Sequence, residues 1–298
     1  MSDKGNDGRV VIVTGAGQGI GRAHAHAFAA DGARVVVNDY DAAAAATVAG
    51  EIRDAGGEAV AAPGDVADWA TGEAIVRMAV DEFGHLDVLV NNAGFVRDRM
   101  LVSLSEDEWD AVVRVHLKGH FVMLRHAGAH WRARAKAGTV PRARIVNTSS
   151  GAGLFGSVGQ GNYSAAKAAI AELTIQAAAE LGGYGVTVNA IAPAARTRMT
   201  MGAGEAMAAQ MAAPDDGSFD AMDPANISPL VVWLGSPASA AVSGRVFEVE
   251  GGRITVLDGW QRAATADKGE RWNPAELGPV VADLIDRSPK QVTPYGAR

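Results

Sequence analysis

Three side chains in the middle of the chain have types and spacings suited to moving a proton. Tyr163 and Lys167 lie four positions apart in an alanine-rich stretch, so a helix would place both on one face. Ser150 precedes Tyr163 by 13 residues, at the end of an expected strand. A tyrosine pKa of about 10 is too high for a base at neutral pH, and an adjacent ammonium lowers it. We therefore expect these three residues to be catalytic, with the hydroxyls of Ser150 and Tyr163 binding the substrate oxygen.

A glycine-rich turn near the start of the chain has the form of a dinucleotide site. The run Thr14-Gly-Ala-Gly-Gln-Gly-Ile-Gly21 follows an apolar run and precedes a helical one. Glycine lets the backbone approach a pyrophosphate, and a helix N-terminus offers free amides. Asp39 ends the next expected strand, 24 residues after Gly15, where a carboxylate binds ribose hydroxyls and repels a 2′-phosphate. The pattern favours NAD over NADP; a plain turn and a solvated aspartate are the alternatives.

Along about the first 250 residues, apolar runs rich in Val and Ile alternate with helical stretches. This order predicts an α/β fold: a Rossmann-like, doubly wound parallel sheet flanked by helices on both faces. The expected strands are Val10–Val13, Arg34–Val37, Asp87–Val90, Arg144–Val146, Val186–Ile191 and Val246–Val249. The expected helices are Ile20–Ala30, Ala42–Ala55, Trp69–Phe83, Glu106–Ala135 and Tyr163–Leu181, with a Ser105–Glu108 capping box before the long one.

Composition excludes several classes of protein. The chain has 298 residues, 48% of them hydrophobic, a net charge of −7 and no cysteine, which argues against disorder, phosphate-backbone binding and disulfides. It has no apolar run long enough for a membrane span, and its start lacks the basic and then apolar segments of a signal peptide, so we expect a cytoplasmic protein.

We expect a catalytic domain over residues 1–252 and a C-terminal arm over 253–298, packed on the same domain or on a partner subunit.

Four motifs together resemble the short-chain dehydrogenase/reductase family over about residues 8–252. They are Thr14-Gly-x-x-x-Gly19-x-Gly21, Asn91-Asn-Ala-Gly94, Ser150 and Tyr163-x-x-x-Lys167. The resemblance implies that the tyrosine exchanges the proton, that the lysine lowers the tyrosine pKa and holds the nicotinamide ribose, and that the serine hydrogen-bonds the substrate.

The resemblance also implies cofactor contacts at several strand ends. Asp65 and Val66 match the pair that contacts adenine, and Thr197 lies in the loop beyond Pro193 that closes over the carboxamide. The expected cofactor-binding set is Gly15, Gln18, Gly19, Ile20, Gly21, Asp39, Asp65, Val66, Asn92, Ala93, Gly94, Tyr163, Lys167, Pro193 and Thr197.

His116 stands where many members of the family carry an asparagine, and we include it among the expected catalytic residues. With Arg97-Asp-Arg99 and Val115-His-Leu-Lys-Gly119, it resembles the (3R)-hydroxyacyl-CoA dehydrogenase unit of peroxisomal multifunctional β-oxidation enzymes. This implies oxidation of a 3-hydroxyacyl-CoA, or of a related acyl-CoA or steroid alcohol, with NAD. The alternatives are a carbonyl reductase of small or polycyclic ketones and a non-enzymatic dinucleotide sensor.

Four arginines follow strand ends and are candidates for binding the phosphates of CoA, with ordinary surface arginines as the alternative: Arg97, Arg99, Arg196 and Arg198. The Ala- and Met-rich segment Thr200–Pro224 suits an apolar lid. The chain is expected to act on a small-molecule substrate and to bind no nucleic acid.

Four histidines, at positions 116, 120, 126 and 130, would share an arc of one straight helix. Only neighbours four apart could share a metal, and two histidines without a carboxylate or cysteine make a poor site. We expect no metal, and packing of these histidines at a subunit contact. The family resemblance implies a homodimer or homotetramer assembled through the Glu106–Ala135 and Tyr163–Leu181 helices.

Overall fold

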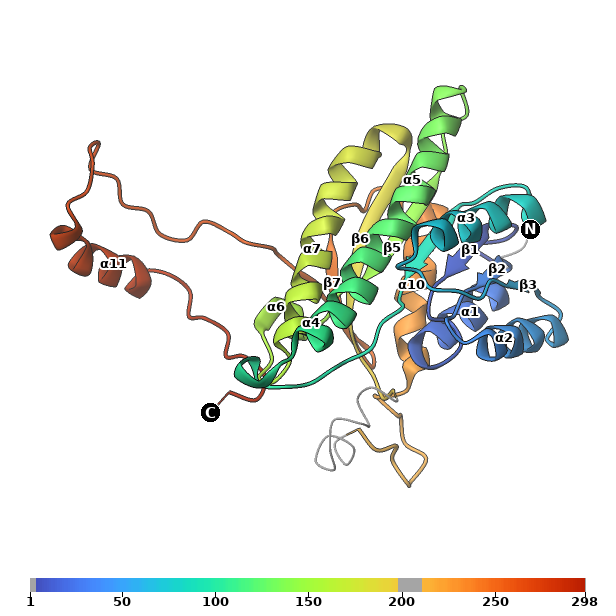
Figure 1. Cartoon of the computed structure of the whole chain (residues 1–298), viewed down its shortest axis with the longest axis horizontal. Coiled ribbons are helices and arrows are strands. Elements are labelled where there is room, and N and C mark those ends of the chain that lie inside the picture. Colours follow the sequence, from blue (N-terminus) through green and yellow to red (C-terminus); the bar gives the residue numbers. More distant parts are fainter. Residues whose placement is uncertain (1–3, 198–210, 298) are drawn as a thin grey trace.

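The computed structural model describes residues 4–197 and 211–297. Within these ranges, eight strands form one sheet in the order β3-β2-β1-β4-β5-β6-β7-β8 (Figure 1). Each described neighbour pair is parallel except β7 and β8. The predicted fold class is thereby confirmed. The strands are β1 Val10–Val13, β2 Arg34–Val37, β3 Glu58–Ala61, β4 Val88–Asn91, β5 Ala143–Thr148, β6 Val186–Ala194, β7 Val246–Glu250 and β8 Arg253–Leu257.

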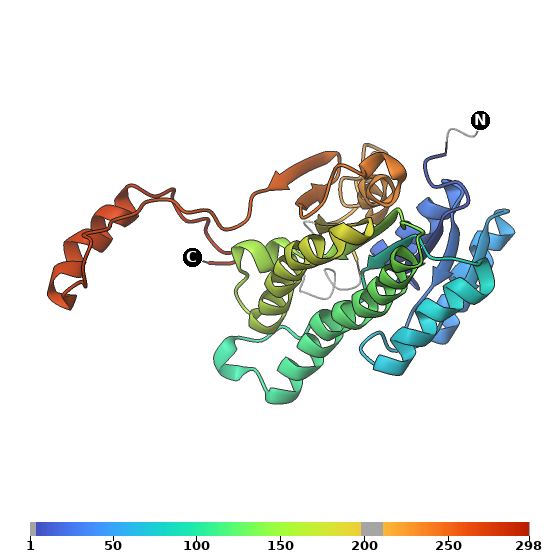
Figure 2. The ribbon, with the colours of Figure 1, turned by 90° about the horizontal axis from the view of Figure 1, so that it is seen from above.

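Helices cover both faces of the sheet, which explains why every residue of the central strands β1, β4 and β5 is buried (Figure 2). Val11 and Val13 pack with Phe28 in one core, while Ile12 packs with Trp131 in the other. The first core lies under α1 Gly19–Ala30, α2 Ala42–Asp54 and α10 Ser228–Gly235. The second lies under α3 Trp69–Phe83, α5 Gly119–Lys136 and α7 Gly161–Leu181. Short 3₁₀ turns are η1 Leu101–Ser103, η3 Gly182–Tyr184, η4 Pro224–Ile227, η5 Pro237–Ser239 and η6 Pro274–Glu276.

The stretch predicted to be helical, Glu106–Ala135, is helical throughout, but a π-helical turn interrupts its regular α-helical spacing. The capping box is confirmed: Glu108 N donates to Ser105 Oγ at 3.2 Å, and Ser105 N donates to Glu108 Oε2 at 3.1 Å. It starts α4 (Glu106–Val113), and a π-helical turn over Arg114–Lys118 then separates α4 from α5. A π turn changes the direction of the side chains within it, and such turns are frequent at functional sites.

The sheet continues beyond residue 252, because β7 and β8 form a hairpin through Gly251 and Gly252. We call residues 4–257 the body and residues 258–297 the extension. The extension carries α11 (Leu277–Asp286), runs away from the body and returns to it beside α6 (Gly151–Phe155) (Figure 1). None of its described residues is buried.

Candidate active site

The glycine-rich turn connects β1 to α1 and allows no side chain at its inner positions. Gly15 has a φ of 60°, and a Cβ there would lie 2.7 Å from Ala93 Cα. A Cβ on Gly21 would lie 2.2 Å from the Gly15 carbonyl oxygen. Gln18, the N-cap of α1, makes no side-chain capping bond, so the first amides of α1 are left for an anion.

Two carboxylates lie near the ends of β2 and β3. Asp39 Oδ2 accepts from Gly17 N at 2.9 Å, which holds the carboxylate against the glycine-rich turn. Asp65 accepts from Ala67 N at 2.9 Å and from Arg114 at 2.6 Å. Both carboxylates therefore have fixed directions at the edge of the cavity.

The segment after β4 closes the other side of the turn. Thr14 Oγ1 accepts from Asn92 N at 2.9 Å and from Ala93 N at 3.1 Å. Asn92 Nδ2 donates to the Thr14 carbonyl at 3.0 Å. Asn91 instead bonds Asn147 inside the sheet and is buried, so the wall begins at Asn92.

Ser150, Tyr163 and Lys167 converge where β5 ends. Ser150 is the N-cap of α6, whereas Tyr163 and Lys167 come from the first two turns of α7. Lys167 Nζ donates to the Thr148 carbonyl at 2.6 Å and lies 5.5 Å from the centre of the Tyr163 ring. The α7 spacing thus brings the ammonium and the phenol together beside Ser150.

The pKa of Tyr163 differs from the expected lowering. Burial raises it, and a hydrogen bond with Ser150 opposes that rise. Burial also lowers the pKa of Lys167 to about 7. The phenol is therefore protonated at neutral pH, beside an amine that titrates near neutral pH.

His116 projects from the π turn into this site. Its ring meets the Tyr163 ring edge-on, with centroids 5.2 Å apart. Nε2 lies 2.6 Å from the Phe95 carbonyl oxygen and 3.1 Å from the Phe95 amide nitrogen, so either tautomer of the ring has a backbone partner at Nε2. Burial, and then Lys167, lower the His116 pKa well below its usual value, so the ring is neutral. Gly94 must lack a side chain, since a Cβ there would lie 2.1 Å from His116 Cε1.

All the predicted site residues line one cavity of about 1430 Å³. They are Gly15, Gln18, Gly19, Ile20, Gly21, Asp39, Asp65, Val66, Asn92, Ala93, Gly94, His116, Ser150, Tyr163, Lys167, Pro193 and Thr197. Several lining residues were not predicted, because no motif contains them: Tyr40, Phe95, Glu248, Glu250, Arg253 and Tyr295.

The three candidate arginines among the described residues have different partners. Arg196 pairs with Asp220, and Arg99 pairs with Glu108 at 3.1 Å. Arg97 lines the cavity, with its guanidinium 4.9 Å from the centre of the Phe95 ring. Arg198 and the first part of the predicted Thr200–Pro224 lid lie outside the described residues.

The other histidines pack or pair. His120 is buried and its pKa falls to about 3, whereas His126 packs on Trp69 with ring centroids 4.6 Å apart. In the described part of the chain, no three His, Asp or Glu residues are grouped to hold a metal. No helix found there has the length and apolar character to cross a membrane.

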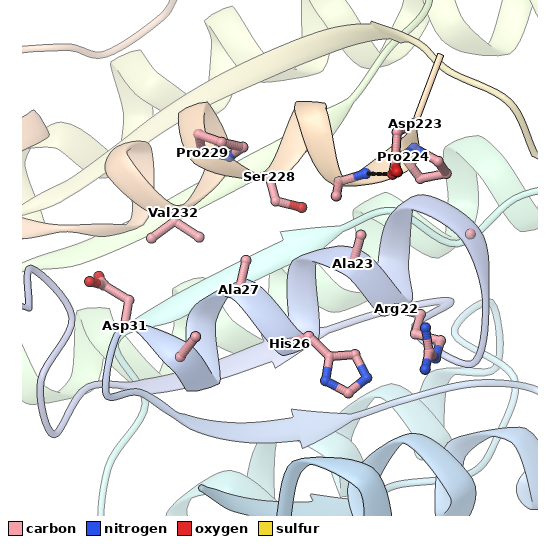
Figure 3. Close-up of a pocket in the computed structure, with 13 residues that line it drawn as sticks. Arg22, Ala23, His26, Ala27, Asp31, Asp223, Pro224, Ser228, Pro229 and Val232 are labelled. Atoms are coloured by element: carbon pink, nitrogen blue, oxygen red, sulfur yellow. Dashed lines mark hydrogen bonds between the residues drawn. The ribbon is translucent and has the colours of Figure 1, made fainter. Parts of the chain in front are cut away.

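A second, more open depression of about 940 Å³ lies between α1 and α10 (Figure 3). Its floor is Ala23 and Ala27, and its polar side chains are already engaged. Arg22 and His26 both lie 2.9 Å from the Glu51 carboxylate, on the side of α1 away from α10. This depression therefore lacks the converging groups of the larger cavity.

Comparison with known proteins agrees with this geometry. The family model described as short chain dehydrogenase matches residues 9–208. The hydroxyacyl-CoA dehydrogenase ChsB1 of Mycobacterium tuberculosis is 47% identical over 296 residues, covering 95% of this chain and 91% of that protein. The peroxisomal multifunctional enzyme type 2 of Mus musculus is 41% identical over 277 residues; the match covers 90% of this chain and 35% of that enzyme.

A solved structure extends the agreement to the fold. The crystal structure of a short chain dehydrogenase from Mycobacterium avium has a TM-score of 0.90 and 59% identity, covering 98% of this chain and all of that one. The predicted resemblance to the family and to its hydroxyacyl-CoA dehydrogenase branch is confirmed. Because the family model and these relatives match most of its length, the chain belongs to the short-chain dehydrogenase family of oxidoreductases.

Proposed function

We propose that this oxidoreductase oxidises the secondary alcohol of a 3-hydroxyacyl-CoA with NAD. The observation that carries the proposal is the convergence of Ser150, Tyr163 and Lys167 in the cavity that the glycine-rich turn opens onto. The identity to a named hydroxyacyl-CoA dehydrogenase over most of both chains supports the substrate class.

The turn fits a dinucleotide. Side chains at Gly15 and Gly21 would collide with backbone, while the uncapped start of α1 faces the cavity. Asp39 would bind the adenosine ribose, and Asp65 and Val66 would flank the adenine. Bound NAD supplies the hydride acceptor.

The chain's own residues manage the proton. The Ser150 hydroxyl donates to the substrate oxygen, and the Tyr163 phenolate accepts the hydroxyl proton as hydride leaves the carbon. Burial opposes formation of the phenolate, so positive charge on Lys167 must favour it. Neutral His116 holds the Tyr163 ring edge-on and acts as a positioning residue.

Tyr163→Phe tests the proton transfer. We expect turnover to fall at least about a hundredfold, the scale of general acid–base catalysis, with NAD binding retained. Nicotinamide absorbance gives turnover, and calorimetry gives NAD affinity. Tyr184→Phe is the matched control, because Tyr184 lies outside the cavity. Near-normal turnover by Tyr163→Phe would refute the assignment.

Asp39→Asn tests the choice of NAD. Loss of the carboxylate removes its repulsion of a 2′-phosphate, so we expect kcat/KM with NADP to rise about tenfold relative to NAD. Asp41→Asn, which keeps a good cap on α2, is the control. A wild-type preference for NADP would contradict the proposal.

Among the described arginines that were predicted to bind CoA phosphates, Arg97 is the best candidate. Arg99 and Arg196 are paired with carboxylates, whereas Arg97 stacks over Phe95. Removing CoA from the substrate should lower kcat/KM, and that loss should shrink in Arg97→Ala. Arg99→Ala is the control: the ratio of kcat/KM for the CoA ester to kcat/KM for the free acid should stay as in the wild type. Equal use of the free 3-hydroxy acid by the wild type would overturn the CoA assignment.

We also propose a homodimer or homotetramer. Large apolar side chains are exposed along the outer helices, including Trp109 on α4, Phe121 on α5 and Ile175 on α7. The molar mass measured by light scattering at micromolar concentration should be a multiple of the 30.7 kDa of one chain.

A further inference from the structure

The last residues of the extension lie against the substrate side of the cavity. Tyr295 N donates to the Gly156 carbonyl at 3.0 Å, and Val158 N donates to the Tyr295 carbonyl at 2.9 Å. These bonds form a parallel bridge between Ser157 and Tyr295. We call residues 294–296 the strap. Two backbone bonds thus connect the strap to the loop between α6 and α7.

The side chain of Tyr295 fits the surface that the strap covers. A Cβ on Gly151 would lie 2.8 Å from Tyr295 Oη, and one on Gly156 would lie 3.2 Å from Pro294 Cβ. The Tyr295 and Phe155 rings meet edge-on, with centroids 6.4 Å apart. Glycine at positions 151 and 156 therefore provides the space that the strap fills. The phenol therefore lies at the start of α6, and Tyr295 and Ser150 line the same cavity.

The environment of the phenol is polar. Glu248, Glu250 and Arg253 line the same end of the cavity, and Arg253 pairs with Glu250. Partial removal from water, and then the two glutamates, raise the pKa of Tyr295, so its hydroxyl keeps its proton at neutral pH. Among the described residues, Tyr295 forms its hydrogen bonds through the backbone and none through the hydroxyl, and half of the residue is exposed (50%). The hydroxyl can therefore donate to a ligand in the cavity.

We propose that the strap is the outer wall of the substrate pocket and that Tyr295 is a specificity-determining residue. It selects substrates whose non-reacting group carries a hydrogen-bonding oxygen, a hydroxyl or a ketone, over plain alkyl groups of equal length. This inference rests on the proposed dehydrogenase activity but does not require CoA.

The test compares two secondary alcohols of equal length, one ending in a methyl group and one in a hydroxyl, from a class that the wild type oxidises. Tyr295→Phe removes only the donor, so the preference for the hydroxyl-bearing substrate should fall roughly two- to tenfold, the worth of one net hydrogen bond. The loss should appear in KM and leave kcat unchanged, because Tyr295 acts on the remote group. Val292→Ala, an exposed position of the extension that does not line the cavity, is the control. Equal changes for both substrates would overturn the proposal.

A second measurement does not depend on activity. Hydrogen exchange at Val158 N should be slow in the wild type and in Tyr295→Phe, and faster in Tyr295→Ala, which loses the ring packing against Phe155. Fast exchange in the wild type would refute the docked strap. If no secondary alcohol is oxidised while Val158 stays protected, the proposed function fails and the selection by Tyr295 fails with it, but the strap stands.

Discussion

The body and the extension are held in place in different ways. In the body, β1 and β4 bury every residue, and two cores lie on opposite faces of the sheet. In the extension no described residue is buried, and its return to the body rests on the bridge at Tyr295. The end of the cavity at the glycine-rich turn therefore has a geometry fixed by a packed core. The end at the strap depends on a few local contacts, which suits the proposed role in specificity.

Glycine substitutions should show this contrast most strongly. A Cβ from Gly21→Ala would lie 2.2 Å from the Gly15 carbonyl and 2.5 Å from Asn92 Nδ2, so backbone must move. We expect the free energy of unfolding to fall by about 1–3 kcal/mol and cofactor affinity to fall at least about tenfold. Urea unfolding and calorimetry with NAD measure the two effects.

Gly278→Ala is the matched substitution in the extension, where the added Cβ would meet no described atom within 4 Å apart from its own chain neighbours and the backbone of α11. It should leave both global unfolding and NAD affinity unchanged. Equal losses in the two variants would show that the extension is as tightly coupled to the fold as the glycine-rich turn, and would remove the contrast.

The dependence of stability on pH should also arise in the body, since the extension contains no histidine. His24 is buried under α10, with Nδ1 2.9 Å from Ser228 Oγ, and burial lowers its pKa to about 3. Between pH 6.5 and 3 the unfolded chain binds a proton at this site that the folded chain does not. Folding stability should therefore be complete above pH 6.5 and fall as the pH drops through this window.

His24→Gln removes this site of proton uptake. The slope of unfolding free energy against pH, measured by urea titrations between pH 4 and 6.5, should decrease by up to about 1.4 kcal/mol per pH unit. The pKa of His120 also falls to about 3, so stability should still depend on pH in the variant, with a smaller slope. An unchanged slope would show that His24 does not stay neutral in the folded chain.

The same contrast explains which parts of the fold the sequence predicts. Buried strands such as Val10–Val13 are apolar throughout, and their pattern is visible without a structure. The strands that were missed lie at the edges of the sheet. β3 has the short sequence Glu-Ala-Val-Ala, and β8 is mostly exposed. The hairpin signal for β8 was present in Gly251-Gly252, which also resembles the end of a domain.

For the candidate site, local spacing was informative and long-range pairing was not. Tyr163 and Lys167 fall on one face of α7 because they are four residues apart. The pairing of Arg196 with Asp220 depends on a partner 24 residues away, and the approach of Tyr295 to Gly151 depends on the path of the whole extension. The π turn at His116 has no signal that we could identify in the sequence.

Two capping boxes, one in each region, provide the finest test of the contrast. Ser105 caps α4 in the body, and Asn273 caps η6, just before α11, in the extension. Each side chain satisfies amides that the helix start leaves without partners, so each should stabilise its own helix to a similar degree. Only α4 is linked to the core, through the buried Val112.

Ser105→Ala should therefore lower the free energy of global unfolding by about 1 kcal/mol, whereas Asn273→Ala should leave it within roughly 0.3 kcal/mol of the wild type. Hydrogen exchange over 277–286 should nevertheless become faster in Asn273→Ala, because the cap acts on α11 locally. A global loss in Asn273→Ala comparable to that in Ser105→Ala would mean that the extension unfolds together with the body.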